Sequence, residues 1–381
     1  MDCVVIGAGL TGLTIARQLA EAGIKVNLIE RRKEIGGNIF DEKMSNGQWV
    51  QKYGPHIFHT NSESVFNFIN KYSDWIPFFL KCAAKFSQET FETPFDFRFI
   101  DKWYKSEEAN NLKKLLEKTF PEGEASILEL LAQSDKRIRE FGLVLYKNDY
   151  LPYTSKQWGL KPAEIDKSVF ERVKVKIGYS SGYFKDKYQL MPKVSFSSFA
   201  QEIAKHRNIS VTTGLNAMER LEFLDNRLEF QKDTPHIFYT GPIDELFKFK
   251  YGPLPYRSLE FEFFYHPEDE FQDYPVIATP EHPTITRVTE FKKLYGQSCV
   301  GSWIANESSM TYMSNSSMER YYPVRTIEST ALYDRYANEL KHYKNLSVCG
   351  RLGDFKYYNM DQAILRALEI SSSFLSDHNK A

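Results

Sequence analysis

The chain has 381 residues, and its 49 basic residues nearly balance its 50 acidic ones, for a formal net charge of −1. This balance excludes a general attraction to nucleic acid or to an anionic membrane surface, so any bound anion must be held by local cations. Hydrophobic residues make up 42% of the chain, and the length predicts two or three lobes rather than one small core.

The first forty residues predict a dinucleotide-binding unit. A short apolar strand from Cys3 to Ile6 leads into a glycine-rich turn and then into a helix with one apolar face. A second strand, Val26 to Ile29, ends at Glu30, eighteen residues after the last glycine of the turn. Strand, glycines, helix, second strand and acid in this order are typical of a Rossmann-like βαβ unit.

Each part of this unit has an expected task. Gly7 permits the tight turn, Gly9 lets backbone N–H groups approach a pyrophosphate, and Gly12 lets the helix pack on the strand. The helix N-terminus at Leu10 and Thr11 then faces the diphosphate, and Glu30 accepts a hydrogen bond from a ribose hydroxyl.

The residues after Glu30 favour FAD over NAD. They read RRKEIGGN, with the paired glycines Gly36 and Gly37. An acid followed at this distance by paired glycines resembles the glutathione-reductase type of FAD protein, especially the amine-oxidase and phytoene-desaturase branch. A second GxGxxG is absent from the sequence, which argues against a dedicated NADPH domain.

The rest of the chain alternates between helical and strand-like stretches. Apolar residues at three-to-four spacing predict helices between residues 61 and about 145, and β-rich stretches follow at 177–190 and 257–306. Residues 195–243 and the C-terminal stretch then return to a strand and helix pattern, and the last helix is predicted to begin near Asn359, with Asp361 in its first turn. We therefore expect a discontinuous cofactor domain with two lobes inserted into it.

Four widely spaced cysteines form no CxxC pair, which predicts reduced thiols and a cytoplasmic protein. The chain enters its first strand without a basic leader, so we expect no signal peptide. No apolar run approaches the roughly 18 residues that a membrane span requires, and no span is expected.

Eight motifs resemble the UDP-galactopyranose mutase family in order and over nearly the whole chain: YGPHIFHT, YTSKQWG, YFKDKYQLMP, YTGPIDELF, YRSLEFE, ITRVTE, YYPV and GRLGDFKYYNMD. The resemblance implies an α/β protein: a Rossmann-like FAD-binding domain with an inserted helical bundle and a six-stranded antiparallel β-sheet domain. The expected ranges are 1–60, 191–250 and 325–381 for the FAD domain, 61–150 for the helical insertion, and 151–190 with 251–324 for a mobile lid and the substrate sheet.

The resemblance also implies an activity, the interconversion of pyranose and furanose forms of a nucleotide sugar, with UDP-galactose as the default. It requires reduced FAD, whose electron-rich N5 can attack the anomeric carbon, and it therefore needs an external reductant. A homodimer is the family's expectation.

Residue roles follow by matching motifs. Arg172 and Arg287 match the family's two catalytic arginines, and His59 and Tyr357 are also expected at the reaction centre. The expected substrate-binding residues are Tyr153, Thr154, Trp158, Tyr183, Tyr322 and Asn359. The expected cofactor-binding residues are Gly7, Gly9, Leu10, Thr11, Gly12, Glu30, Arg31, Gly37, Asn38, His56, Ile57, Arg351, Asn359, Met360 and Asp361.

Simpler interpretations exist for several of these residues. His56 and His59 have a spacing that recurs in metal sites, but no Cys, Asp or Glu cluster nearby completes one, so a wall of the flavin pocket is favoured over a metal site. A single tyrosine or tryptophan is more often core than ligand. Arg287 could pair with Glu290 on the surface, and Asn359 could be a helix N-cap.

Several positions depart from the family pattern and leave the sugar open. Asn359 replaces an aspartate, Ala278 a sugar-contacting asparagine, Arg325 an asparagine, and Lys176 lies where the family has an arginine. Loss of a polar group at Ala278 fits a substrate with fewer or differently placed hydroxyls, such as dTDP-fucopyranose. A flavin amine oxidase or desaturase is the alternative of another class, but it has no need for Arg172 or Arg287.

Overall fold

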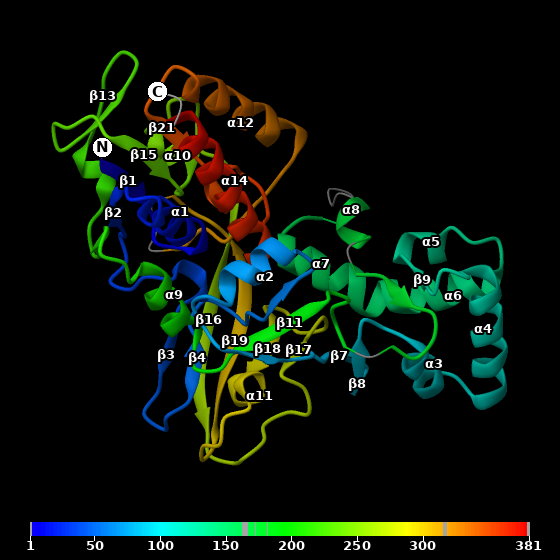
Figure 1. Cartoon of the computed structure of the whole chain (residues 1–381). Helices are drawn as coiled ribbons and strands as arrows, with labels where there is room; N and C mark the ends of the chain where they lie inside the picture. Colours follow the sequence, from blue (N-terminus) through cyan, green and yellow to red (C-terminus); the bar gives the residue numbers. More distant parts are fainter. Residues whose placement is uncertain (1, 162–166, 172, 181, 315–317, 379–381) are drawn as a thin grey trace.

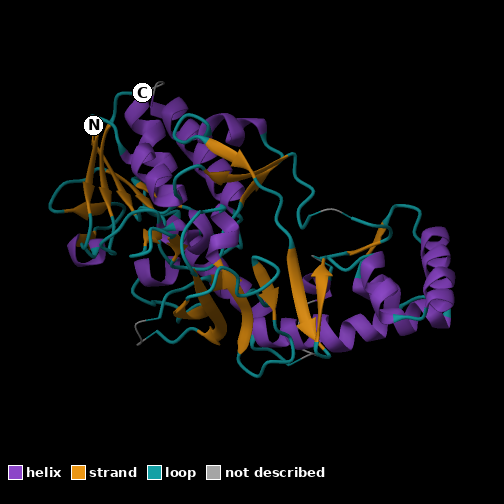
Figure 2. Ribbon diagram, turned by 90° about the horizontal axis from the view of Figure 1, so that it is seen from below, coloured by secondary structure: helices purple, strands orange, loops and turns teal. Residues whose placement is uncertain are grey.

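The computed structural model describes residues 2–161, 167–171, 173–180, 182–314 and 318–378. The two termini lie on one lobe, a large sheet lies beneath it, and a helical lobe extends to one side (Figure 1). Figure 2 shows the same helical lobe projecting away from the sheets. Within the described ranges, the helices are too short or too polar to cross a lipid bilayer.

A five-stranded parallel sheet forms the centre of the first lobe, in the order β12-β2-β1-β15-β21. Its strands are β1 (Asp2–Ile6), β2 (Lys25–Ile29), β12 (Ile209–Thr212), β15 (His236–Tyr239) and β21 (Leu346–Val348). Helices α1 (Leu10–Glu21), α9 (Phe196–Ala204) and α14 (Met360–His378) pack together beside it. Helix cover on a parallel sheet explains why Cys3–Ile6 of β1 are apolar and buried, whereas β2 buries Val26, Leu28 and Ile29 and exposes Lys25 and Asn27.

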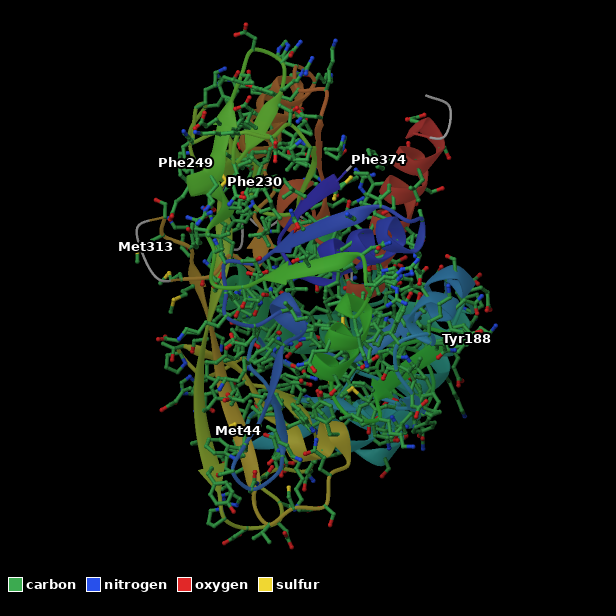
Figure 3. All side chains as sticks on the ribbon, turned by 60° about the vertical axis from the view of Figure 1, so that its left-hand side comes forward. Met44, Tyr188, Phe230, Phe249, Met313 and Phe374 are labelled. Carbon is green, nitrogen blue, oxygen red and sulfur yellow. The ribbon has the colours of Figure 1, made fainter. Side chains whose placement is uncertain are left out.

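The C-terminal helix closes one side of this sheet. Phe374 of α14, labelled in Figure 3, contacts two rings of β15, with centroid distances of 4.6 Å to His236 and 5.2 Å to Phe238. Smaller elements surround the lobe: β13 (Leu221–Phe223), β14 (Leu228–Phe230), α10 (Ile243–Leu246), α12 (Ile327–Leu340) and α13 (Gly350–Gly353).

The large sheet has seven strands in the order β20-β16-β19-β18-β17-β7-β8, and not the expected six. They are β20 (Tyr322–Pro323), β16 (Tyr256–His266), β19 (Ser302–Thr311), β18 (Ile285–Glu290), β17 (Val276–Ala278), β7 (Cys82–Phe86) and β8 (Glu89–Thr93). All neighbours are antiparallel except β17 and β7, which pair in parallel.

The extra hairpin β7-β8 comes from residues 82–93, inside the stretch expected to be helical. Its two-residue turn places Ser87 and Gln88 at φ values of +50° and +64°. Hairpin turns of this kind usually carry Asn or Gly, so the sequence offers no turn motif there. The buried face of the hairpin, which includes Phe86 and Phe91, joins the core of the helical lobe.

The helical lobe contains α3 (Phe97–Trp103), α4 (Ser106–Thr119), α5 (Ile127–Leu131), α6 (Lys136–Leu145), a π-helical turn (Tyr146–Tyr150) and α7 (Leu151–Trp158). Its core is aromatic, with Phe95, Phe99 and Phe141 fully or almost fully buried. A capping box of Ser126 and Glu129 begins α5.

A third, three-stranded sheet of β5 (Phe58–Thr60), β11 (Tyr188–Pro192) and β6 (Trp75–Pro77) links the lobes. Among the described residues of the strand-like stretch expected at 177–190, only those from Tyr188 onward form a strand, β11. The remaining elements are β3 (Asp41–Lys43), β4 (Trp49–Gln51), α2 (Glu63–Ile69), β9 (Glu124–Ala125), α8 (Lys167–Phe170), β10 (Val175–Lys176), α11 (Phe291–Tyr295) and short 3-10 turns at Gly37–Ile39 and Ala217–Arg220.

Candidate cofactor cavity and substrate cleft

The glycine turn between β1 and α1 forms a cradle that side chains would fill. Gly7 has a φ of +100°, and a Cβ there would stand 2.1 Å from Oγ1 of Thr240. A Cβ on Gly12 would stand 1.9 Å from the carbonyl oxygen of Gly7, and one on Gly37 would stand 2.8 Å from Cα of Gly9. The backbone at the N-terminus of α1 is therefore left open, which fits a diphosphate.

The Glu30 carboxylate is hydrogen-bonded to the backbone of this turn. It is 6% exposed, and its two oxygens accept from the backbone N–H groups of Ala8 at 2.8 Å and of Arg32 at 2.9 Å. Each oxygen keeps further acceptor capacity, so a ribose hydroxyl can still donate to this group.

Three arginines and two glutamates form an ionic cluster at the same end of the cavity. Nη2 of Arg31 is 2.7 Å from Oε2 of Glu319, Nη2 of Arg32 is 3.1 Å from the same oxygen, and Nη1 of Arg320 is 2.6 Å from Oε2 of Glu245. Nη1 of Arg32 and Nε of Arg320 are buried donors without a hydrogen-bond partner in the described chain. Buried donors are almost always paired, so this end of the cavity is built for a polar ligand.

Most of the cofactor residues expected from sequence line one cavity. Those on its wall are Gly7, Gly9, Leu10, Thr11, Glu30, Arg31, Gly37, Asn38, His56, Arg351, Asn359 and Met360. The cavity therefore runs from the glycine turn to the first turn of α14.

Three expected cofactor residues do not line this cavity. Gly12 supports the turn, Ile57 is 6% exposed within the apolar core, and Oδ2 of Asp361 accepts from Oγ1 of Thr60 at 3.1 Å. Gly12 and Ile57 are occupied by packing, whereas Asp361 keeps Oδ1 as a buried acceptor without a hydrogen-bond partner among the described residues.

His56 is a neutral acceptor on the cavity wall. Its Nδ1 is 2.8 Å from the carbonyl oxygen of Gly54, and a carbonyl only accepts, so Nδ1 carries the proton and Nε2 does not. Burial and the positive charges of Arg351 and Arg287 lower the pKa of His56 to about 4, while the Gly54 carbonyl raises it. His56 thus lies within electrostatic reach of both arginines and is uncharged near pH 7.

His59 occupies a different environment. Its Nδ1 is 2.9 Å from Oδ2 of Asp186, and its ring stacks on Phe184 at a centroid distance of 3.8 Å. It is not among the residues that line the cofactor cavity. Its contacts tie β5 to the segment that carries Tyr183, and its expected role at the reaction centre stays a prediction.

Arg287 is fixed by a buried carboxylate. Arg287 on β18 and Glu307 on β19 are cross-strand partners, and Nε and Nη2 of the arginine are each 2.7 Å from Oε2 of the glutamate. Burial lowers the pKa of Arg287, but Glu307, Tyr153 and Tyr322 together raise it by more. The net shift is upward, so the guanidinium stays charged. The surface pairing with Glu290 is wrong, because Glu290 is fully buried and accepts from backbone N–H groups of residues 271 and 272.

Aromatic side chains connect Arg287 to the cofactor cavity. The Arg351 guanidinium lies 5.6 Å from the ring centre of Tyr322 and 5.2 Å from that of Tyr357, and these two rings are 5.5 Å apart. Burial raises the pKa of Tyr322, and the charges of Arg287 and Arg351 oppose this shift, so Tyr322 is within electrostatic reach of both arginines. Arg287 likewise acts on the Tyr153 hydroxyl.

Helix α7 carries three of the expected substrate residues. The Tyr153 hydroxyl is within electrostatic reach of Arg287, Thr154 is 8% exposed, and Trp158 is the last helical residue before Gly159, whose φ is +63°. Tyr183 acts electrostatically on Tyr153, so the segment after the expected lid reaches the same cleft. Asn359 lines the cofactor cavity, and its carbonyl accepts from the N–H of residue 363 at the start of α14, as a helix cap does.

Of the positions that depart from the expected family pattern, Ala278 lies beside Arg287, whereas Lys176 lies in the β9-β10 pair. Ala278 is directly opposite Arg287 in the β17-β18 pair. Lys176 is 2.8 Å from Oε2 of Glu124, which also pairs with Lys174 and Lys185. Arg172 lies outside the described residues.

Sequence reasoning missed several residues at this site. Glu307 is an isolated acid in a strand, and its role as the partner of Arg287 is seen only from the register of β18 with β19. The glycine-rich motif does not include Glu245, Glu319 or Arg320. No sequence signal sets Arg257 apart from other strand residues. Arg257 donates to the carbonyl oxygens of residues 156 and 157 at 3.4 Å and 3.0 Å, which fixes the C-terminus of α7.

The parallel sheet, the glycine cradle and the cavity between them define a dinucleotide-binding protein of the Rossmann-like class. A family model for an NAD(P)-binding Rossmann-like domain matches residues 5–72, and one for UDP-galactopyranose mutase matches residues 149–357. The chain belongs to the UDP-galactopyranose mutase family.

Full-length relatives agree with this assignment. A probable UDP-galactopyranose mutase of Klebsiella pneumoniae is 35% identical over 98% of this chain and 95% of its own length. A dTDP-fucopyranose mutase of Escherichia coli is 32% identical over 99% of both chains. A solved structure of reduced UDP-galactopyranose mutase has the same fold, with a TM-score of 0.73, 16% identity, and coverage of 98% of this chain and 95% of that one.

Proposed function

We propose that the chain is a flavin-dependent mutase that interconverts the pyranose and furanose forms of a nucleotide sugar. The observation that supports this proposal most strongly is the buried Arg287–Glu307 ion pair. Tyr322 is within electrostatic reach of Arg287, and its ring also lies beside Arg351 on the wall of the dinucleotide cavity. An amine oxidase or desaturase has no use for a fixed cation at this place.

FAD fits the cavity, and reduced FAD is the active form in this proposal. Gly7, Gly9 and the N-terminus of α1 would hold its diphosphate, and Glu30 would accept from its ribose. When bound and reduced, the flavin supplies an electron-rich nucleophile for the anomeric carbon of the sugar. An external reductant must therefore serve the enzyme, which we place in the cytoplasm.

Arg287 would hold the nucleoside diphosphate while its bond to the sugar is broken. Glu307 occupies Nε and Nη2, so the guanidinium keeps one orientation and presents Nη1 to a phosphate oxygen. Of the described carboxylates, none pairs with Arg351, which is held instead by carbonyl oxygens of residues 321 and 358. Its full positive charge thus remains available between the cofactor cavity and the cleft.

Tyr322, Tyr357 and Tyr183 would donate to the same phosphates, while Tyr153 and Trp158 form the cleft wall. Burial raises the pKa of Tyr153 and Tyr322, so both hydroxyls keep their protons and remain donors near neutral pH. The proposed assignment of Arg172 to the diphosphate rests on its motif alone.

UDP-galactose is the default substrate, and dTDP-fucopyranose is the specific alternative. Ala278 supports the alternative, because it places a methyl group opposite Arg287 where the family has a polar side chain. The Escherichia coli relative named dTDP-fucopyranose mutase supports it as well.

The test is to incubate the purified flavoprotein with UDP-galactopyranose, UDP-galactofuranose or dTDP-fucopyranose, with and without dithionite, and to separate the products by chromatography. We expect isomerisation only after reduction. Hydrogen peroxide formed from an amine or alcohol, with no isomerisation of any nucleotide sugar, would contradict the proposal.

A further inference from the structure

A buried chain of hydrogen bonds, which the proposed function does not use, ends on the backbone of His56 in the wall of the cofactor cavity. The chain consists of Gln51 at the end of β4, Tyr295 at the end of α11 and Asp41 at the start of β3. Gln51 is fully buried and Asp41 is 1% exposed. Asp41 and Gln51 are cross-strand partners in the β3-β4 pair, so their side chains lie on the same face of it.

The side chain of Gln51 binds both backbone polar groups of His56. Its Oε1 accepts from the His56 N–H, and its Nε2 donates to the His56 carbonyl oxygen at 3.0 Å. A second hydrogen of Nε2 is donated to the Tyr295 hydroxyl oxygen at 3.2 Å. One side chain therefore fixes the peptide groups on both sides of His56, and with them the direction in which the imidazole leaves the backbone.

Asp41 sets the direction of every hydrogen bond in this chain. Its two carboxylate oxygens accept from the backbone N–H groups of the first two residues of α9, at 2.8 Å and 2.9 Å. A carboxylate only accepts, so the Tyr295 hydroxyl donates to Asp41, and the hydroxyl oxygen accepts from Gln51. The Gln51 amide group thus has one orientation, in which Oε1 is left to accept from the His56 N–H.

The imidazole of His56 is fixed as well. Its Nδ1 donates to the Gly54 carbonyl oxygen at 2.8 Å, so three of the four polar groups of His56 are bound inside the protein. The fourth, Nε2, is an acceptor on a residue that lines the cavity. A buried polar network with all its members paired keeps one geometry, because any rearrangement leaves a buried group without a partner.

We propose that Gln51 is a positioning residue of the flavin site: together with Tyr295 and Asp41 it holds His56, and thereby the hydrogen bonding of the bound flavin, in one arrangement. This inference rests on the FAD of the proposed function. Two-electron reduction adds hydrogen to ring nitrogens of a flavin, so a fixed acceptor beside the ring interacts differently with the oxidised and reduced forms. The position of His56 therefore contributes to the midpoint potential of the flavin.

The experiment measures this midpoint potential in the FAD-loaded protein by spectroelectrochemical titration against a reference dye, at constant pH and without any nucleotide sugar. Gln51→Met keeps the length of the side chain but removes both hydrogen bonds to His56. Tyr295→Phe removes the hydroxyl that orients Gln51. Both variants are expected to shift the midpoint potential and the absorbance maxima of the bound flavin in the same direction, and Gln51→Met by more, because in Tyr295→Phe the amide still contacts His56.

Two combined variants test whether these residues act in series. Tyr295 acts through Gln51, so Gln51→Met with Tyr295→Phe should have the same midpoint potential as Gln51→Met alone. Gln51 acts through His56, so adding Gln51→Met to His56→Phe should shift the potential no further. Additive shifts in either pair would contradict the chain of contacts.

Gln48→Met is the matched control. Gln48 is also fully buried and lies one residue before β4, but its Oε1 accepts from the Trp303 N–H at 2.9 Å. This variant should lower the free energy of unfolding, as Gln51→Met does, and keep the wild-type midpoint potential.

Each outcome decides the matter. A wild-type potential in Gln51→Met, or an equal shift in Gln48→Met, would overturn the role of Gln51. If Gln51→Met does not retain FAD, Tyr295→Phe carries the test, and a wild-type potential there would overturn the proposal. The expected potentials without isomerisation of any nucleotide sugar would overturn the proposed function alone, and a wild-type protein that binds no FAD would overturn both.

Discussion

Arg287 occupies a position where removing one side chain should separate catalysis from cofactor binding. It contacts Glu307 and the cleft, while the cofactor cavity is lined by other residues. Arg287→Ala is expected to lower turnover by about 100-fold or more, since in the proposed function it removes the cation that would stabilise developing charge on the leaving diphosphate. The measurement is turnover with reduced enzyme, together with the flavin absorbance of the purified protein.

Arg287→Lys serves as the matched variant for this prediction. A lysine keeps the charge but not the forked donor geometry, so partial activity is expected. If Arg287→Ala is purified without its yellow colour, the residue supports the fold rather than the reaction.

At the scale of single residues, the sequence predicted the cofactor side better than the substrate side. Gly7, Gly12 and Glu30 act through their neighbours along the chain, so a local motif contains most of what is needed to place them. Glu307 acquires its role only from the register of β18 with β19, which the sequence does not state. His56 and His59 share one motif, yet only the structure separates the neutral cavity residue from the one bound to Asp186.

Helix α7 is held by interactions along the helix and at its C-terminus that fix its position. Nζ of Lys156 donates to the carbonyl oxygens of residues 279, 282 and 285, each at 2.6 Å, and thereby anchors α7 to the turn between β17 and β18. Arg257 holds its C-terminus. Together these contacts determine where Tyr153 and Trp158 lie.

Lys156→Met is expected to loosen this anchor. The loss of charge-assisted hydrogen bonds should lower the free energy of unfolding by about 1–3 kcal/mol and raise KM more than it lowers kcat. Urea unfolding and steady-state kinetics test this, with Lys147→Met as the control because that lysine is exposed and lies nine residues earlier, in the π-helical turn. A raised KM in the control as well would show that α7 is not held in this way.

At the scale of helices and strands, the spacing of apolar residues correctly predicted the elements that local sequence determines. The βαβ unit, the helix beginning near Asn359 and the strands of residues 257–306 follow from apolar spacing and turn residues. The hairpin β7-β8 did not, because Ser87 and Gln88 adopt left-handed conformations without glycine or asparagine. Its parallel pairing with β17 joins segments nearly two hundred residues apart, which no local pattern predicts.

For the whole molecule, two histidines predict a loss of stability in acid. Burial lowers the pKa of both His56 and His236 to about 4, from an ordinary value of 6.5. Between these values the unfolded chain binds more protons than the folded one, so the free energy of unfolding falls as the pH drops from about 6.5 to about 4. Above that range these histidines contribute no further pH dependence.

Urea unfolding of the FAD-loaded protein across this range measures the effect. His236→Gln is the variant of choice, because His236 lies in β15 against Ser347 and Phe374 and does not line the cofactor cavity. It should show a shallower decline than the wild type, and the exposed His342→Gln should match the wild type. An unchanged slope in His236→Gln would mean that this histidine is already protonated in the folded state.

The topology of the parallel sheet also bears on synthesis of the protein. Its edge strand β21 ends at residue 348, and Arg351 and Met360 complete the cofactor cavity, whereas the glycine cradle begins at residue 7. A nascent chain therefore carries an incomplete cradle until residues 346–360 have left the ribosome, with one edge of β15 unpaired in the meantime. Chaperone protection and a ready supply of flavin matter most in that late interval of translation.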